Sequence, residues 1–145
     1  GLGMVQHWID VDESFEIIEF SQSNDERLRS MALFDAIINN TDRKIGHLLP
    51  TKDGEIFGCD HGVTFHVEDK LRTVLWQWRG HAFNEEESAQ LTRFIVEFEN
   101  WSGLVGELLT DEEKEITRQR VLELLDFGKF PFPSEDWPAI PWPPV

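Results

Sequence analysis

The stretch from Asn39 to Gly62 constrains the fold more than any other part of this sequence. Two apolar runs flank the pair Asp53-Gly54, which is a strong signal for a tight turn, so a β-hairpin is expected over Leu48–Cys59. A hairpin returns the chain to the edge from which it started. His47 and Asp60 should therefore approach each other at its open end, although 13 residues separate them in sequence.

A helix is expected over residues 24–38, immediately before this hairpin. Ser23 or Asn24 can cap its first turn, and the acidic residues that follow suit the positive end of a helix. Asn39 and Asn40 can end it, because Asn tolerates the left-handed backbone conformation. Asp42 then lies just past a buried helix. Apolar residues recur within the helix at helical spacing: Leu28, Met31, Ala32, Phe34, Ala36, Ile37 and Ile38.

Three other segments are less well defined. Residues 4–9 are interpreted as a short strand. The apolar stretch Phe15 to Phe20 could be either helix or strand. Residues Thr73 to Trp78 could form a strand or an apolar helical turn, and the pattern does not decide between them.

Two capping boxes predict the helical part of the chain, residues 84–128. Asn84 with Glu87 should start one helix, and Thr110 with Glu113 another. Gly128 fits the position just after the second helix. The first helix should carry Leu91, Phe94, Ile95, Phe98 and Trp101 on one face, and the second Ile116, Val121, Leu124 and Leu125.

The tail, residues 129–145, holds six of the seven prolines together with Trp137 and Trp142. Such a segment can be neither a regular helix nor a central strand. We expect an extended segment that packs on its own domain, since bare tryptophan in a free tail lowers solubility. An exposed peptide ligand is the alternative.

Composition excludes several classes of function. A chain of 145 residues predicts a single domain, and its net charge of −15 argues against binding nucleic acid or anionic membrane. Cys59 is the only cysteine, so no intramolecular disulfide can form, and a reducing cytoplasm fits best. No transmembrane segment is expected, because no run of 18 apolar residues occurs, and no N-terminal stretch has the pattern expected of a secretory signal.

The residues Asn39-Asn40-Thr41-Asp42-Arg43-Lys44-Ile45-Gly46-His47 and Asp60-His61-Gly62 resemble a known pair of motifs. They are similar to the catalytic loop and the metal-binding Asp-x-Gly of the phosphatidylinositol 3-/4-kinase-related branch of the protein-kinase-like fold. The resemblance is closest to a small bacterial group in that branch, and it runs from about Met31 to Gly80. The fold it implies is α+β: a mostly helical, kinase-like C-terminal lobe over residues 1–128, with a small hairpin at the site and a Pro/Trp-rich tail.

This resemblance implies a role for each site residue. Asp42 would orient or deprotonate the acceptor hydroxyl, and Lys44 would neutralise the transferred phosphate. Asp60 would hold the metal of ATP with Mg²⁺ or Mn²⁺, and Gly62 would allow unusual backbone angles after it. His47 stands where kinases carry a second metal ligand, an Asn, and its imidazole suits Mn²⁺ or Zn²⁺ better than Mg²⁺.

The resemblance also places residues 1–10 as the strand that begins the hinge between two kinase lobes. Backbone groups of Met4 and Gln6 would then meet the adenine, with Leu49 of the hairpin as a third cofactor-binding residue. The chain has neither a Gly-rich phosphate loop nor a strand Lys. We therefore expect an N-terminal lobe, supplied by a parent chain, to be missing from these residues, and the chain alone to be inactive.

Two functions remain open from the sequence. The chain is either the catalytic lobe of an ATP-dependent phosphotransferase with an unknown hydroxyl-bearing substrate, or a degenerate kinase-fold module used for binding. Lys70, Arg72 and Arg79 form the only basic cluster after Asp60. They could contact an anionic substrate, but local ion pairs are the simpler expectation.

Overall fold

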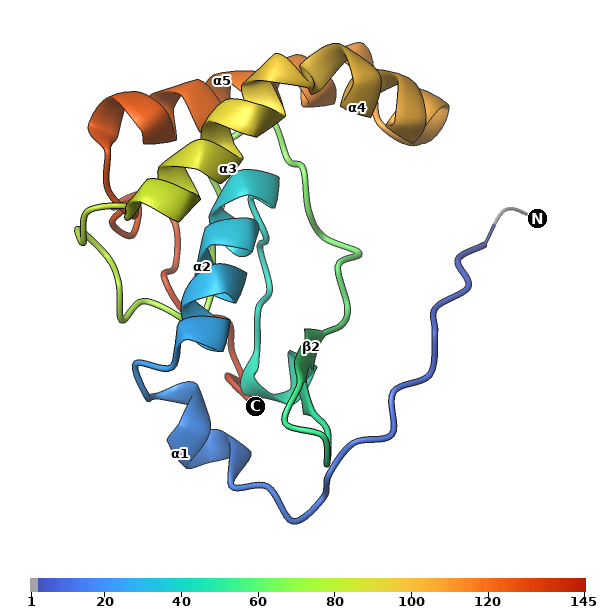
Figure 1. The fold of residues 1–145 in the computed structure, drawn as a ribbon, viewed down its shortest axis with the longest axis vertical. Helices are drawn as coiled ribbons and strands as arrows, with labels where there is room; N and C mark the ends of the chain where they lie inside the picture. The colour runs from blue at the N-terminus through green and yellow to red at the C-terminus, as the bar shows by residue number, and fades with distance from the viewer. Residues whose placement is uncertain (1–2) are drawn as a thin grey trace.

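The computed structural model describes residues 3–145, which form an α+β fold with five α-helices and one two-stranded antiparallel sheet (Figure 1). Gly1 and Leu2 lie outside the described residues. The elements follow in the order α1 Ile17–Ser21, α2 Glu26–Ile38, the 3-10 turn η1 Ile45–His47, β1 Leu48–Pro50, β2 Ile56–Gly58, α3 Glu85–Val96, α4 Phe98–Val105, the 3-10 turn η2 Gly106–Leu108 and α5 Asp111–Phe127.

The expected hairpin is confirmed. β1 pairs with β2 in the register Leu48 to Gly58, Leu49 to Phe57 and Pro50 to Ile56. Gly54 closes the turn with a φ of 82°, a left-handed conformation that glycine adopts without steric cost. The amide of Cys59 donates to the carbonyl of His47 at 3.0 Å, which extends the pairing up to the site.

The expected central helix is also confirmed, with a small shift at its start. Asp25, rather than Ser23 or Asn24, is the N-cap, and its carboxylate accepts from the amide of Arg27. Asn39 ends α2 in the left-handed conformation, with a φ of 53°. The loop that carries Asp42 therefore starts from a fixed point.

Both capping boxes form as expected, at Asn84 and at Thr110, and Gly128 ends α5 with a φ of 71°. The single helix expected through Trp101 is instead two helices, α3 and α4. Glu97 interrupts it with a ψ of 9°, outside the helical range. Beyond the break, Phe98 begins α4, packs against Phe94 with ring centres 6.1 Å apart, and lies under Arg118 of α5.

The core lies where α2, α3 and α5 meet the irregular segment after the hairpin. Figure 1 shows α3 and α5 crossing the end of α2. Leu28, Leu91 and Val121, one from each helix, are fully buried. Thr73 to Trp78 is neither strand nor helix, yet Leu75 and Trp78 fill the core beside them. In the stretch Phe15 to Phe20, the residues from Ile17 on belong to the short helix α1.

The tail packs on the domain, as expected. Phe130 is buried, and the amide of Thr73 donates to the carbonyl of Ala139 at 3.0 Å. The amide of Ile45 donates to the carbonyl of Pro144 at 2.8 Å. The end of the chain is thus bonded to the first residue of η1, three residues after Asp42.

The strand predicted over residues 4–9 is wrong. Within residues 3–145 this segment pairs with no other strand, and it runs as an exposed arm beside the hairpin (Figure 1). Met4 is 80% exposed and Val5 100% exposed. Apolar β-propensity cannot make a strand without a neighbouring edge to bond its amides and carbonyls.

Candidate functional site

Asp42 lies on the loop after α2, between two cations. Its carboxylate is 3.2 Å from the guanidinium of Arg72 and 3.6 Å from the ammonium of Lys44. The side chain of Asn40 fixes the loop by accepting from the amide of Asp42 at 3.0 Å. Asp42 is therefore held in place, while about a quarter of its side chain stays accessible.

Arg43 joins this loop to the second half of the site. Its fully buried guanidinium forms two hydrogen bonds with Asp35 of α2, at 2.9 and 2.8 Å. It also donates to the carbonyl of Cys59 at 3.1 Å and contacts the ring nitrogen Nε2 of His61 at 2.8 Å. The residues on both sides of Asp60 are thereby bonded to the residue that follows Asp42.

Two further hydrogen bonds join the loop of Asp42 to the loop that follows Asp60. The amide and hydroxyl of Thr41 both donate to the carbonyl of Val63 at 3.0 Å. The loop of Asp42 and the loop of Asp60 therefore lie side by side, joined through their backbones.

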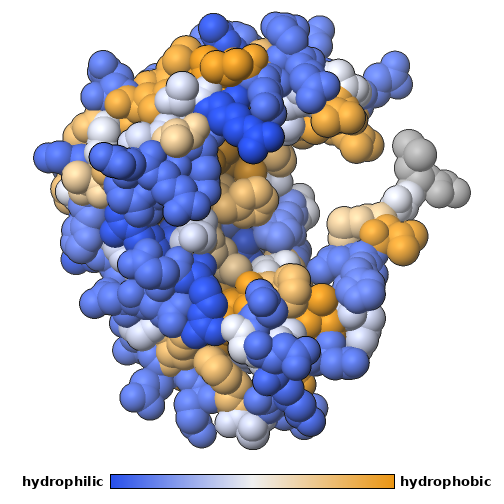
Figure 2. Space-filling view, viewed as in Figure 1, coloured by the Kyte–Doolittle hydropathy of each residue, from blue (hydrophilic) through white to orange (hydrophobic). Residues whose placement is uncertain are grey.

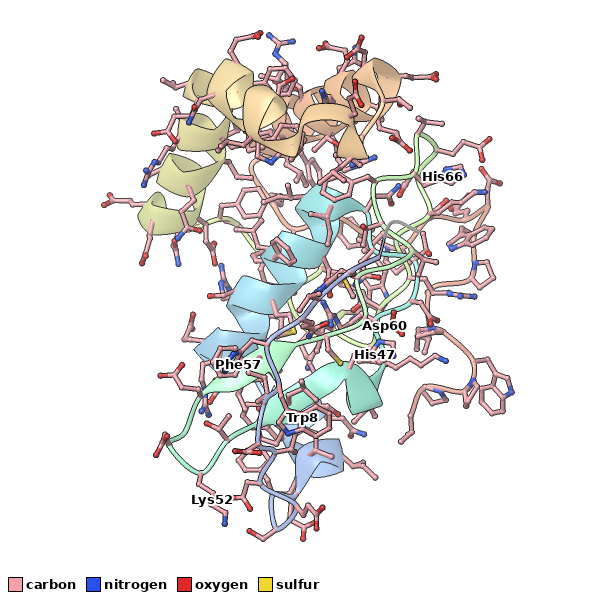
Figure 3. All side chains as sticks on the ribbon, turned by 90° about the vertical axis from the view of Figure 1, so that its right-hand side faces the viewer. Trp8, His47, Lys52, Phe57, Asp60 and His66 are labelled. Carbon is pink, nitrogen blue, oxygen red and sulfur yellow. The ribbon has the colours of Figure 1, made fainter. Side chains whose placement is uncertain are left out.

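His47 and Asp60 meet at the open end of the hairpin. Nε2 of His47 is 3.5 Å from a carboxylate oxygen of Asp60, and Figure 3 shows the two side chains adjacent to each other. Nδ1 of His47 accepts from the amide of Lys44 at 3.3 Å. A neutral imidazole that accepts at Nδ1 carries its proton on Nε2, so His47 presents an N–H to Asp60.

The tautomer of His47 determines whether its ring can bind a metal ion. With Nδ1 accepting and Nε2 protonated, the His47 ring has no free lone pair, so it does not fit as a metal ligand in this arrangement. Asp60 does fit a Mg²⁺ or Mn²⁺ ion that takes its other ligands from nucleotide phosphates and water. No group of three or more His, Cys, Asp or Glu that could hold a metal occurs within residues 3–145.

The unusual backbone angles that were expected at Gly62 occur instead at Asp60. Asp60 has a φ of 56°, whereas Gly62 is not among the residues with positive φ in the described chain. The side chain of Asp60 is 61% exposed. Asp, like Asn, is one of the few non-glycine residues that adopt this left-handed conformation readily.

An open hollow of about 920 Å³ lies between the N-terminal arm and the hairpin, lined by residues that include Gln6, Trp8, Lys52, Phe57 and Gly58. Figure 3 shows Trp8, on the N-terminal arm, lying in front of the hairpin. Of the three cofactor residues expected from the sequence, only Gln6 lines this hollow. Met4 lies in the exposed arm, and Leu49 is a half-buried residue of β1 opposite Phe57.

The basic residues after Asp60 do not form one cluster. Arg72 bonds Asp42 and the carbonyl of Thr41, and Lys70 pairs with Glu68. Both cations lie over the ring of Trp137, at 5.9 and 5.0 Å from its centre. Arg79 instead donates to the carbonyl of Trp76. Local ion pairs, the simpler expectation, therefore describe Lys70 and Arg72, whereas Arg79 bonds a backbone carbonyl.

Sequence reasoning missed that Arg72 and Trp137 belong to the surroundings of Asp42. They are 30 and 95 residues away from it in the chain. The sequence of a Pro-rich tail does not indicate which side chains its Trp will contact. The position of Trp137 depends on where the whole tail packs.

The pKa values of two side chains next to Asp60 are shifted by their surroundings. Burial, with the nearby Arg43 cation, lowers the pKa of His61. Burial raises the pKa of the Cys59 thiol above its ordinary value. Both shifts favour the neutral form, so neither side chain adds charge beside the carboxylate of Asp60.

Residues 3–145 contain no helix with both the length and the apolar character needed to cross a membrane.

Comparison with known proteins gives one informative match. The chain is 38% identical over 138 residues to a Mycobacterium tuberculosis protein named Protein Rv2133c, and the alignment covers 91% of the chain and 48% of that protein. The chain thus spans about half the length of this relative. No known family profile matches the sequence, and no solved structure matches it.

Proposed function

We propose that this chain is the catalytic-lobe portion of an ATP-dependent phosphotransferase related to the phosphatidylinositol 3-/4-kinases. The observation that carries the proposal is the joining of two loops, one with Asp42 and one with Asp60, by Arg43 and by Thr41 with Val63. Phosphoryl transfer needs few covalent steps from the protein and depends on positioning and charge. Two fixed, accessible carboxylates on adjacent loops support that kind of chemistry.

We infer a distinct task for each residue. Asp42 would accept the proton of the substrate hydroxyl, and Lys44 beside it would offset charge on the transferred phosphate. Asp60 would hold the divalent cation, whose role is to neutralise the nucleotide phosphates. His47, whose Nε2 lies 3.5 Å from the Asp60 carboxylate, would help to orient that carboxylate, a change from the metal ligand that the motif implies.

Nucleotide binding can be tested on this chain with Mn²⁺ and ATP, because a paramagnetic ion broadens nearby amide NMR signals even when binding is weak. We expect Mn²⁺ with ATP to broaden the amides of Cys59, Asp60 and His61 more than those of α5. Asp60→Asn should remove this selective broadening, since the anionic ligand is lost.

The matched control is Asp53→Asn, which removes an exposed carboxylate at the tip of the same hairpin. It should leave the broadening around Asp60 unchanged. Broadening spread evenly over the acidic surface, or equal loss in both variants, would contradict a specific site at Asp60.

Phosphate transfer itself can be tested in a longer protein that contains this chain and has the full length of the Mycobacterium tuberculosis relative. Asp42→Asn should lower the rate of phosphate transfer by about 10²- to 10⁴-fold, the usual contribution of a general base, while Mn²⁺ with ATP still binds. A variant that transfers phosphate at the original rate would rule out the role of Asp42.

A degenerate binding module is the second candidate, and one observation favours it. The Asp42 carboxylate is paired with both Arg72 and Lys44, so much of its charge is already neutralised in this chain. If Asp42→Asn binds nucleotide and partners as the original chain does, and no transfer is found in the full-length protein, the binding module is the better description.

A further inference from the structure

A second pocket lies on the far side of the loop that follows Asp60, between α5, the end of α2 and the start of the tail. Its volume is about 330 Å³, within the range of roughly 300–1,000 Å³ common for small-molecule sites. Ala36, Leu71 and Leu124 form a buried apolar floor. Phe127 and Phe132 form one wall with ring centres 6.4 Å apart, and both rings are about half exposed.

Arg120 is the group in this pocket that is hardest to explain by packing alone. Its guanidinium donates to the carbonyls of Ile37 at 3.0 Å and of His66 at 2.9 Å. His66 is labelled in Figure 3, on the loop near α5. A guanidinium has five N–H donors, so these two bonds leave three of them without a protein partner among residues 3–145.

Arg120 also makes no ion pair within residues 3–145, unlike Arg118 on the same helix, which pairs with Glu115. Burial lowers the pKa of the Arg120 guanidinium, and the nearby charges of Asp69 and Glu123 oppose that shift in part. Both carboxylates lie at the exposed rim, where solvent screens them. Arg120 is therefore a half-buried cation with free donors beside an apolar floor, and no carboxylate among residues 3–145 lies at ion-pair distance from it.

We propose that this pocket is a binding site for a small amphipathic carboxylate. The apolar body of the ligand lies on Leu71 and Leu124 against the ring of Phe132. Its carboxylate accepts hydrogen bonds from the free N–H groups of Arg120, an interaction for which the planar guanidinium is well suited. The proposal does not depend on the phosphotransferase assignment, because none of Asp42, Lys44, His47 and Asp60 lines this pocket.

The test is a titration of the amide NMR spectrum with naphthoate, using naphthalenemethanol as the uncharged analogue. Naphthoate should give saturable shifts at Val67, Gln119 and Phe132. Arg120→Gln should weaken naphthoate about tenfold or more, since a charge-assisted hydrogen bond is lost. The same variant should leave the binding of naphthalenemethanol unchanged.

Arg118→Gln is the matched control, because it removes the same charge from the same helix outside the pocket. It should leave naphthoate binding unchanged. Equal weakening in both variants, equal affinity of the acid and the alcohol for the original chain, or shifts centred on the N-terminal arm would each overturn the proposal.

A second variant covers the case in which Arg120→Gln fails to fold. Gln119→Trp keeps Arg120 and places a large ring at the exposed mouth of the pocket, so it should abolish naphthoate binding, whereas Gln119→Ala should preserve it. Retained binding in a folded Gln119→Trp chain would show that naphthoate binds elsewhere.

Discussion

At the scale of single residues, Arg43 contributes most to the geometry of the site. Both Arg43 and Asp35 are fully buried, so neither charge can be solvated if the other is removed. We expect Arg43→Met to destabilise the chain by about 3–5 kcal/mol, because it leaves a buried carboxylate unpaired. Urea unfolding followed by circular dichroism measures this loss.

The control for Arg43 is the double variant Arg43→Met with Asp35→Leu, which removes both charges. It should recover a large part of the lost stability, since replacing a whole buried pair with apolar groups is often neutral. A double variant as unstable as the single one would mean that the bonds to Cys59 and His61 matter more than the ion pair.

His61 gives a prediction for how the stability of the chain depends on pH. Because Arg43 can only donate, Nε2 of His61 must accept, and the ring stacks edge-on against Phe34 at 5.6 Å. The pKa of His61 is lowered on folding, so the unfolded chain binds its proton more readily. The stability from neutral His61 is therefore complete above the unfolded pKa and is lost as pH falls through the folded value.

The measurement compares urea unfolding of the original chain and His61→Gln between about pH 7.5 and 5. Gln can still accept from Arg43 but does not titrate. We expect the original chain to lose stability relative to the variant as pH falls through this range. Parallel stability curves would show that His61 does not couple folding to pH.

At the scale of elements, Glu87 links the start of α3 to α2. Its carboxylate completes the capping box with the amide of Asn84 at 2.8 Å and accepts from Arg29 of α2 at 2.9 Å. Burial raises the pKa of Glu87, but the bonds from Arg29 and Asn84 outweigh it and leave the pKa lowered. Glu87 thus remains ionised against α2.

We expect Glu87→Gln to destabilise the chain by about 1–3 kcal/mol, because the side chain can still cap α3 but the charged bond to Arg29 is lost. Thermal unfolding measures the change. Glu86→Gln, an exposed neighbour in the same first turn, is the control and should change stability by less than about 0.5 kcal/mol. Equal effects would assign the loss to the helix dipole rather than to Arg29.

At the scale of the whole molecule, the tail closes the back of the Asp42 loop. The amides of Ile45 and Thr73 have tail carbonyls as acceptors, and Trp137 covers Lys70 and Arg72. Figure 2 shows scattered apolar groups on a largely hydrophilic surface, in keeping with a net charge of −15. The tail therefore holds the segments on either side of Asp42 through these hydrogen bonds and ring contacts.

Removing residues 137–145 should speed hydrogen exchange at the amides of Ile45 and Thr73 by about tenfold or more, relative to that of Leu91 in the core. Mass spectrometry or NMR exchange measures this directly. Trp142→Ser changes a side chain that is 87% exposed and should leave both amides protected. Unchanged exchange after truncation would mean that the tail does not hold the loop.

Local chemistry explains which parts of the fold could be predicted. The Asp53-Gly54 turn, the Asn39 helix end and the capping boxes at Asn84 and Thr110 all depend on residues close in sequence, and all formed. The break at Glu97 and the unpaired arm depend on what lies next to them in space. Periodicity carries no information about such neighbours.

The sequence by itself determined the hairpin and the loop positions of Asp42, His47 and Asp60, because turn and capping preferences act over a few residues. Only the tertiary structure decided that Arg43 joins the two loops, that His47 presents an N–H to Asp60, and that the tail reaches the site. These contacts arise from packing and hydrogen bonds between segments far apart in the chain. No local pattern encodes them, since burial selects the partners only when the core assembles.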